Sequence, residues 1–143
     1  MFDETHLNNK SKIDFILEAE DEAFSNKKIV NTNGSGFSES KSNFILANSS
    51  GFCDGYKSSQ FTAYCEVVSK SNGSMERDYE FSSKRYYKDL LTAKELGSKA
   101  SELAIRKLNP KKIKSEKINL IFDRRVANNF LSSFSSAVTS SSI

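Results

Sequence analysis

The sequence predicts an α+β fold, with a mostly antiparallel mixed sheet, one long hairpin and three amphipathic helices. Apolar and polar residues alternate in Gln60–Ser69 and again in Met75–Phe81, which is the period of half-buried strands. The turn composition of Ser71–Ser74 joins these two strands into a hairpin. Apolar residues recur at helical spacing in three further segments, residues 12–24, 92–108 and 124–138.

The register of this hairpin depends on the length of its loop. A two-residue loop places Val67 opposite Asp78, whereas a three-residue loop places Val67 opposite Tyr79. A slip of one residue moves every side chain to the other face of the sheet. The three-residue loop matches apolar with apolar residues, so it is the register we predict. It also sets Glu66 opposite Glu80, which requires a solvated face.

Three further strands complete this prediction. Asn33–Gly36 is interpreted as a turn because of its glycines, so it separates two strands. The compact apolar run Ile118–Phe122 indicates a buried strand. The hairpin of residues 60–82 is expected to be the longest antiparallel pair. The predicted strands lie near residues 28–31, 37–48, 60–70, 75–82 and 117–122.

Each predicted helix has a start signal. Ser11 is an acceptable N-cap for the first helix, and Asp123 can cap the third. Thr92 and Glu95 have the spacing of a capping box for the second helix. The small residues Gly97 and Ala100 on its apolar stripe predict a close approach to the sheet.

Two regions are expected along the chain. Residues 1–11 are polar and predict a disordered N-terminus. Residues 12–143 form the structured region. Its last helix runs into residues 139–143 without a C-cap, so we expect this region to be truncated at its C-terminus.

Composition excludes several classes of function. The chain has 143 residues and a net charge of +3 with interspersed charges, and no aromatic-basic platform indicates nucleic-acid binding. No run of about 18 apolar residues is present, so no membrane span is predicted. The chain has two cysteines and no secretory signal, which predicts reduced thiols and a cytoplasmic location.

No catalytic, cofactor-binding or metal-binding residue is predicted. The only histidine, His6, lies in the polar N-terminus, and a zinc site takes three or four His, Cys or carboxylate ligands. The acidic face of the helix at residues 12–24 is expected to be solvated. Gly34, Ser35 and Gly36 lack the spacing and following helix of a phosphate loop.

An independent hydrolase is the least favoured alternative. Nucleophilic catalysis needs a positioned base, which His6 does not provide. The acidic residues Glu66, Glu76, Asp78 and Glu80 allow paired-carboxylate chemistry if Glu66 and Glu80 face each other across the hairpin.

Four segments in order resemble the PmbA/TldD family, also known as modulators of DNA gyrase or peptidase U62. They are Lys28–Gly34, Ser50–Tyr56, Gly73–Tyr79 and Leu108–Asp123. The segment GSMERDY at Gly73–Tyr79 resembles the PmbA branch in particular. Because the resemblance extends over about residues 12–143, it implies an incomplete, central portion of a larger PmbA/TldD fold.

The resemblance implies that this chain lacks the metal site. In the TldD branch that site is an HExxxH helix in the second half of the protein, with a later cysteine. This sequence contains no HExxxH, and no metal ligand can be carried over. The family is metallopeptidase-related, but the resemblance predicts that this chain alone is inactive and needs no cofactor.

The resemblance also implies a role and partners. The family processes peptides, by leader-peptide removal or antitoxin proteolysis, and PmbA pairs with TldD. This chain is therefore expected to be a non-catalytic scaffold or partner-binding segment. Its expected partner is a missing half or a TldD-like subunit, or a second copy that binds through the helix near Val126–Val138. The strand Gln60–Ser69 could hold a peptide by edge pairing, but a role in the sheet core is the favoured expectation. The alternative is a non-functional remnant of a split or decaying gene.

Overall fold

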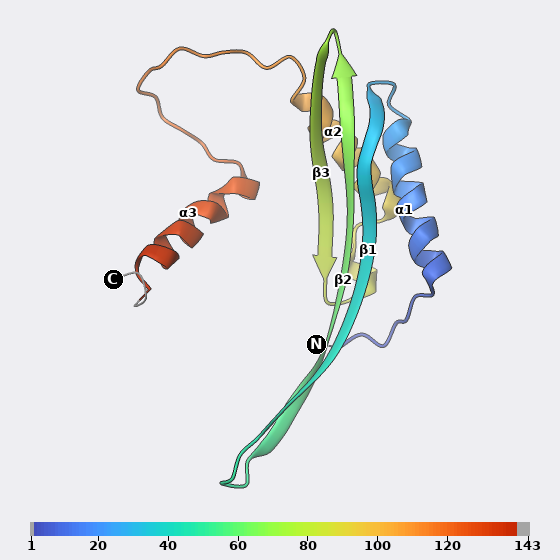
Figure 1. Ribbon diagram of the computed structural model, residues 1–143, viewed down its shortest axis with the longest axis vertical. Coiled ribbons are helices and arrows are strands. Elements are labelled where there is room, and N and C mark those ends of the chain that lie inside the picture. Colours follow the sequence, from blue (N-terminus) through green and yellow to red (C-terminus); the bar gives the residue numbers. More distant parts are fainter. Residues whose placement is uncertain (1, 140–143) are drawn as a thin grey trace. The chain divides into compact units, whose positions relative to one another are not determined.

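The computed structural model describes residues 2–139, which divide into two units at Pro110 (Figure 1). The first unit contains a three-stranded antiparallel sheet of order β1-β2-β3, together with two helices and a short 3-10 turn. The second unit contains one helix. This confirms the α+β fold class. The elements are α1 (Asn9–Phe24), β1 (Ile29–Ala47), β2 (Cys53–Ser71), β3 (Ser74–Lys84), η1 (Tyr87–Asp89), α2 (Ala93–Arg106) and α3 (Arg124–Ala137).

The core of the first unit lies between the sheet and its two helices. Alternate residues of β2 point at the helices and are buried, including Phe61, Cys65 and Val67. Leu96 and Ala100 of α2 are buried in the same layer. The sheet therefore has one covered face, as the alternation of β2 predicted.

The predicted register of the β2–β3 hairpin is wrong. The loop has two residues, Asn72 and Gly73, which both take positive φ values of 49° and 84°. Asn-Gly suits this tight turn, and the turn sets the register, so Val67 lies opposite Asp78. The covered face accepts Asp78 because its carboxylate lies 3.0 Å from Nζ of Lys107.

The predicted turn at Asn33–Gly36 is also wrong, because β1 continues through it. The ladder between β1 and β2 shifts register near Gly34, whose φ of 117° fits a bulge and not a reversal. The β1–β2 ladder runs from Ile29 to Ala47, so it is longer than the β2–β3 hairpin, against the prediction. The chain reverses instead at residues 48–52, after which Asp54 and Gly55 lie within β2.

The helix starts are partly as predicted. The capping box of α2 is confirmed, with Thr92 Oγ1 accepting from the Glu95 amide at 3.3 Å. Helix α1 begins three residues earlier than predicted, and Asn8 is its cap in place of Ser11. Gly97 faces α1 rather than the sheet, since a Cβ there would press into the carbonyl oxygen of Ala19.

Residues before α1 contact the sheet. The Asp3 amide donates to Ser59 Oγ at 2.9 Å, and the Asp3 carboxylate accepts from the Tyr87 amide at 2.8 Å. The predicted boundary at residue 11 lies inside α1. The disorder predicted for residues 1–11 stays a prediction, which hydrogen exchange can check.

The second unit differs from its prediction at residues 117–122. This segment forms no strand, and Ile121 is 99% exposed. Helix α3 is present, with Asp123 accepting from the Arg125 amide at 2.9 Å as its N-cap. Its large apolar side chains Phe130, Leu131 and Phe134 are exposed, and the Phe130 ring lies 4.4 Å from that of Phe122.

Candidate functional site: a projecting arm and exposed apolar faces

The predicted carboxylate pair does not form. Glu66 lies opposite Tyr79, and its carboxylate is 4.0 Å from Nε of Arg77. Glu80 lies opposite Cys65. Glu66 and Glu80 therefore occupy opposite faces of the sheet, because the observed register is one residue away from the predicted one.

The described residues, 2–139, contain no group of three His, Cys, Asp or Glu side chains that could hold a metal ion. The absence of catalytic, cofactor and metal residues stays a prediction. The stretch Gln60–Ser69 forms part of the sheet, which is the role favoured for it, and peptide binding there stays a prediction. β2 is the central strand there, with β1 on one side and β3 on the other, so this stretch offers no open edge.

His6 belongs to a charge cluster around Glu39. Nζ of Lys12 lies 2.9 Å from the Glu39 carboxylate, and Nζ of Lys41 and Nδ1 of His6 each lie 3.3 Å away. Burial raises the pKa of Glu39, but hydrogen bonds from Lys12, the Leu7 amide, Lys41 and His6 outweigh it and lower the pKa to about 2. This cluster joins the N-terminal segment, α1 and β1. The arrangement fits a structural clamp and not a catalytic base, which needs a pKa near neutrality.

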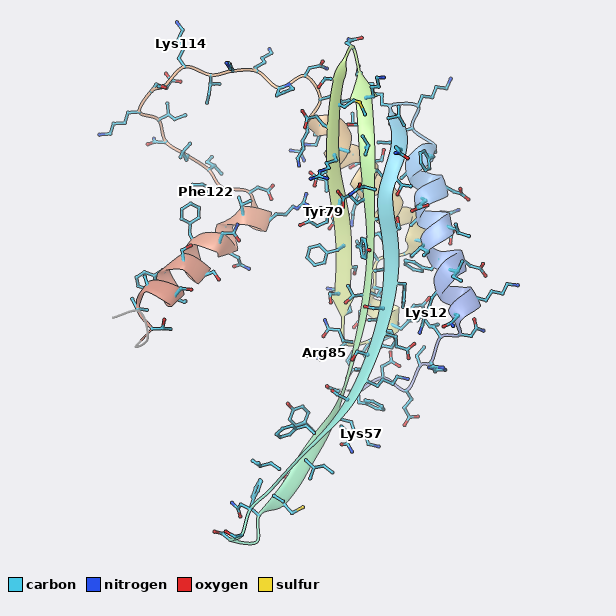
Figure 2. All side chains as sticks on the ribbon, in the orientation of Figure 1. Lys12, Lys57, Tyr79, Arg85, Lys114 and Phe122 are labelled. Atoms are coloured by element: carbon cyan, nitrogen blue, oxygen red, sulfur yellow. The ribbon has the colours of Figure 1, made fainter. Side chains whose placement is uncertain are left out.

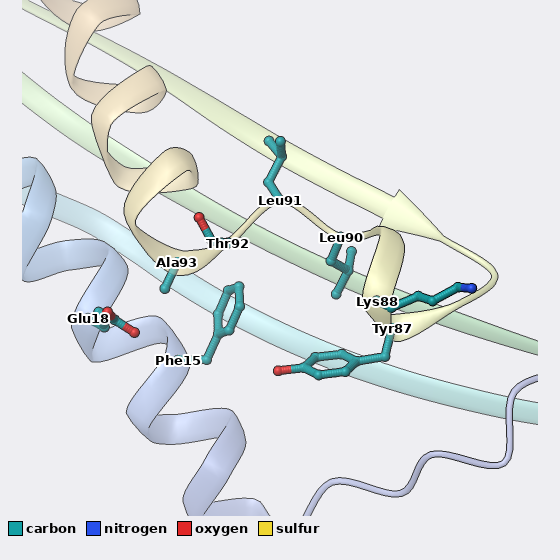
Figure 3. Close-up of a pocket in the computed structure, with 8 residues that line it drawn as sticks. All are labelled: Phe15, Glu18, Tyr87, Lys88, Leu90, Leu91, Thr92 and Ala93. Carbon is teal, nitrogen blue, oxygen red and sulfur yellow. The ribbon is translucent and has the colours of Figure 1, made fainter.

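A shallow cavity of about 300 Å³ lies beside the start of α2 (Figure 3). Phe15 of α1 and Tyr87 of η1 form its walls, and Glu18 and Lys88 also line it. The Tyr87 ring lies 5.8 Å from Phe61, which links the cavity wall to the core. None of these lining residues forms a constellation for nucleophilic or acid–base chemistry.

The outer face of the sheet carries aromatic side chains that neither α1 nor α2 covers. Tyr64, Tyr79 and Phe81 are exposed on this face, and the rings of Tyr79 and Phe81 lie 6.2 Å apart. The Tyr64 ring lies over Gly36, where an added Cβ would stand 2.5 Å from ring atom Cε1. The predicted register places Tyr79 and Phe81 opposite buried residues of β2, so it assigns these two aromatics to the wrong face.

The most distinctive surface is an arm formed by residues 42–58. β1 and β2 continue together beyond the end of β3, which pairs last with Phe61 (Figure 1). The arm contains Lys57 on one strand, and its side chains project without a covering helix (Figure 2). Five of its large apolar side chains are exposed, namely Phe44, Ile45, Leu46, Phe52 and Tyr56.

The two cysteines lie in contrasting places. Cys53 is exposed in the arm, and Cys65 is buried in the core. Burial raises the pKa of the Cys65 thiol. Of the two thiols, that of Cys53 is therefore the one accessible to reagents in solution.

No helix among residues 2–139 has the length and apolar character needed to cross a membrane.

Known proteins resemble this chain over most of its length. The family model described as PmbA/TldA metallopeptidase central domain matches residues 2–108. The chain is 30% identical to the metalloprotease PmbA homolog of Buchnera aphidicola from Acyrthosiphon pisum, covering 100% of this chain and 32% of that protein. It is 28% identical to metalloprotease PmbA of Escherichia coli O157:H7, with the same coverage of both chains.

Solved structures show the same fold. A Bacteroides thetaiotaomicron protein named as a modulator of DNA gyrase matches 94% of this chain and 31% of its own, with a TM-score of 0.82 and 28% identity. A Thermotoga maritima protein with a similar name matches 81% of this chain and 28% of its own at a TM-score of 0.72 and 18% identity, which shows the fold alone. The chain spans about a third of the length of the curated relatives it matches. Because the family model matches most of the sequence, the chain belongs to the PmbA/TldD family, whose central domain its residues 2–108 form.

Proposed function

We propose that this chain is a non-catalytic, PmbA-type segment that provides scaffold and partner-binding surface for peptide processing. Its family includes proteins named metalloprotease PmbA, which supports a connection to proteolysis. The role as a scaffold without its own metal site is our proposal. The observation that carries it is the stripe of large apolar side chains exposed on α3: Phe130, Leu131, Phe134 and Val138.

The physical argument is the free energy of burying this stripe. Burying a Phe or Leu side chain contributes roughly 1.5–3 kcal/mol relative to leaving it exposed. Exposed apolar clusters of this kind mark interaction surfaces. α3 is amphipathic, with Asn128, Ser132 and Ser135 on its polar side, so one face suits solvent and the other suits a protein.

The partner we propose is a polypeptide of the same family, either a TldD-like subunit or the remaining portion of a longer PmbA-type protein. Association of two copies through α3 is the other form of this proposal. The relatives are about three times as long as the part that this chain matches, since it covers 32% of each. A peptide substrate would then be held by the assembly and not by this chain alone.

Sedimentation velocity of the full chain tests α3 as the docking face. We compare wild type with Phe130→Ser/Phe134→Ser, alone and mixed with a TldD-like protein. Asn128→Ser/Ser132→Ala on the polar side of α3 is the matched control. Loss of association in the first variant but not in the control supports the proposal. If the first variant instead loses stability as a monomer, the stripe is ordinary core and the proposal is wrong.

A further inference from the structure

We infer that the arm binds a second copy of this chain through the outer edge of β1, residues 42–47. In this interface two arms join edge to edge around a two-fold axis, as one antiparallel four-stranded sheet. The surface is separate from α3, so this inference goes beyond the function proposed above.

The arm has two open edges among the described residues. β3 ends opposite Phe61, so the side of β2 that faces away from β1 has no strand next to it over residues 53–58. The N-terminal segment contacts β1 at Lys41, whose Nζ donates to the carbonyl oxygens of Glu4 and Thr5 at 3.0 and 2.7 Å, and its Phe2 ring lies 5.8 Å from Nζ of Lys57 on β2. Beyond Lys41, the outer edge of β1 presents its backbone donors and acceptors to solvent.

The two edges differ in charge. Natural edge strands that must stay apart carry Lys, other charges or Pro. The β2 edge contains Asp54 and Lys57, whereas β1 contains no charged residue and no proline from Ser42 to Ala47. The β1 edge is therefore the one that lacks protection against pairing.

The same lack of charge indicates a second copy as the occupant. A two-fold axis pairs a strand with itself in antiparallel orientation, so each charge would meet a nearby like charge. Centred on Phe44, the pairing sets Asn43 opposite the second copy's Ile45, and Ser42 opposite its Leu46. No like charges oppose each other in this register.

Phe44 is the natural centre because its ring already has an aromatic neighbour. The Phe44 and Tyr56 rings lie 5.4 Å apart, and the two residues are directly paired across β1 and β2. Two-fold pairing at Phe44 extends this contact into a row of four rings across the joined sheet. Offset and tilted aromatic pairs stabilise such contacts beyond their buried area.

The available area suits a reversible dimer. The exposed fractions of Phe44, Ile45, Leu46, Phe52 and Tyr56 lie between 49% and 64%. At roughly 150–250 Å² for each large side chain, the arm exposes on the order of 400–700 Å² of apolar surface. A standard interface buries about 800 Å² for each partner, so this smaller area suits an association that is reversible and depends on protein concentration.

A charge-pairing experiment on the full chain tests both the interface and its register. Asn43→Lys/Ile45→Lys places lysines directly opposite lysines in the proposed pairing. Asn43→Glu/Ile45→Lys introduces the same number of charges but sets each glutamate opposite a lysine. Both variants also carry Lys57→Ser, because Lys57 lies opposite Asn43 within the same arm. We expect sedimentation velocity to show a dissociation constant at least about tenfold weaker for the first variant than for the second.

A crosslinking experiment gives an independent measurement. In a Cys53→Ser background, Phe44→Cys sets two thiols opposite each other on the axis, with Cα atoms about 4.5–5.5 Å apart, which a disulfide can span. We expect covalent dimers with oxidised glutathione. Ile45→Cys in the same background is the control, because its thiol faces Asn43 of the second copy, and it should crosslink far less.

Three results would overturn the inference. Wild type could remain a monomer up to several hundred micromolar. The two charge variants could dissociate equally, or Phe44→Cys and Ile45→Cys could crosslink equally. A fourth result would also overturn it: Phe130→Ser/Phe134→Ser could abolish the dimer while Asn43→Lys/Ile45→Lys leaves the dimer intact. Self-association would then belong to α3. This inference would fail, but the function proposed above would not.

Discussion

The same two strands, β1 and β2, exist in two environments within this protein. Near α1 and α2, alternate residues of β2 from Ser59 to Ser69 are buried under the helices. In the arm, the strands carry apolar residues of similar size, but these side chains remain exposed. Strand sequence and pairing are thus insufficient to make a core, because burial depends on the layer that packs against the sheet.

The largest expected difference between the two environments comes from truncating one aromatic ring in each. Phe61→Ala in the covered half should lower the free energy of unfolding by about 3–5 kcal/mol, because it leaves a cavity around a fully buried ring. Phe44→Ala in the arm should lower it by no more than about 1 kcal/mol. Urea unfolding at low protein concentration measures both. Equal losses would mean that the arm is supported as firmly as the core.

Two glycines offer a finer comparison. A Cβ at Gly97 would press into the Ala19 carbonyl oxygen, and one at Gly55 would press into that of Phe44. Gly97→Ala should lower stability by about 1–3 kcal/mol, because α1 and α2 are fixed by the core. Gly55→Ala should have a smaller effect, since two unsupported strands can shift apart. Thermal unfolding compares them, with Lys99→Ala as the control on the exposed side of α2. A larger loss for Gly55→Ala would contradict the proposed freedom of the arm.

The clamp at Glu39 lies where the covered half meets the arm. The pKa of the Glu39 carboxyl is lowered from an ordinary value of 4.5 to about 2, so this carboxylate binds a proton less readily in the folded protein than in the unfolded chain. The resulting stability is present above pH 4.5 and is lost as the pH falls toward 2. Glu39→Gln should lower the free energy of unfolding by about 1–3 kcal/mol at neutral pH. The difference in this free energy between wild type and Glu39→Gln should become smaller as the pH falls from 4.5 toward 2.

Glu102→Gln, on the exposed side of α2, is the control for this pH series. A gap between wild type and Glu39→Gln that stays constant from pH 6 to pH 3 would show that the cluster does not act through ionisation of Glu39.

The smallest expected effect is that of metal removal, which should leave the stability of both the covered half of the sheet and the arm unchanged. The prediction rests on the sequence, which has one histidine and no HExxxH motif. Dialysis against a chelator should not shift the thermal midpoint, and elemental analysis of untagged protein should find no stoichiometric zinc. Zinc that survives dialysis would contradict the proposed non-catalytic role.

Local signals in the sequence predicted local structure well. Thr92 and Glu95 predicted the capping box because both partners lie within one turn of helix. The alternation of β2 predicted its covered face. The family resemblance, with four short motifs in order, predicted the fold that the comparisons confirm.

Two of the errors share a physical cause, which is that apolar character does not specify burial. Tyr79 and Phe81 were matched with buried residues, yet the Asn72-Gly73 turn sets the register and Asp78 is neutralised by Lys107. The apolar run at residues 117–122 predicts a buried strand, but the structure leaves this segment without a sheet partner. The arm was missed because nothing in a strand sequence shows where its covering helices end.

The contact between Asp3 and the Tyr87 amide has a consequence for folding kinetics. It joins residues 84 positions apart, whereas both hairpins close through short turns. Local pairs form early and distant pairs late, because the entropy of loop closure opposes the distant ones. We therefore expect the N-terminal segment before α1 to dock onto the sheet after the rate-limiting step of folding. Asp3→Ala should speed unfolding in stopped-flow experiments and leave the refolding rate nearly unchanged.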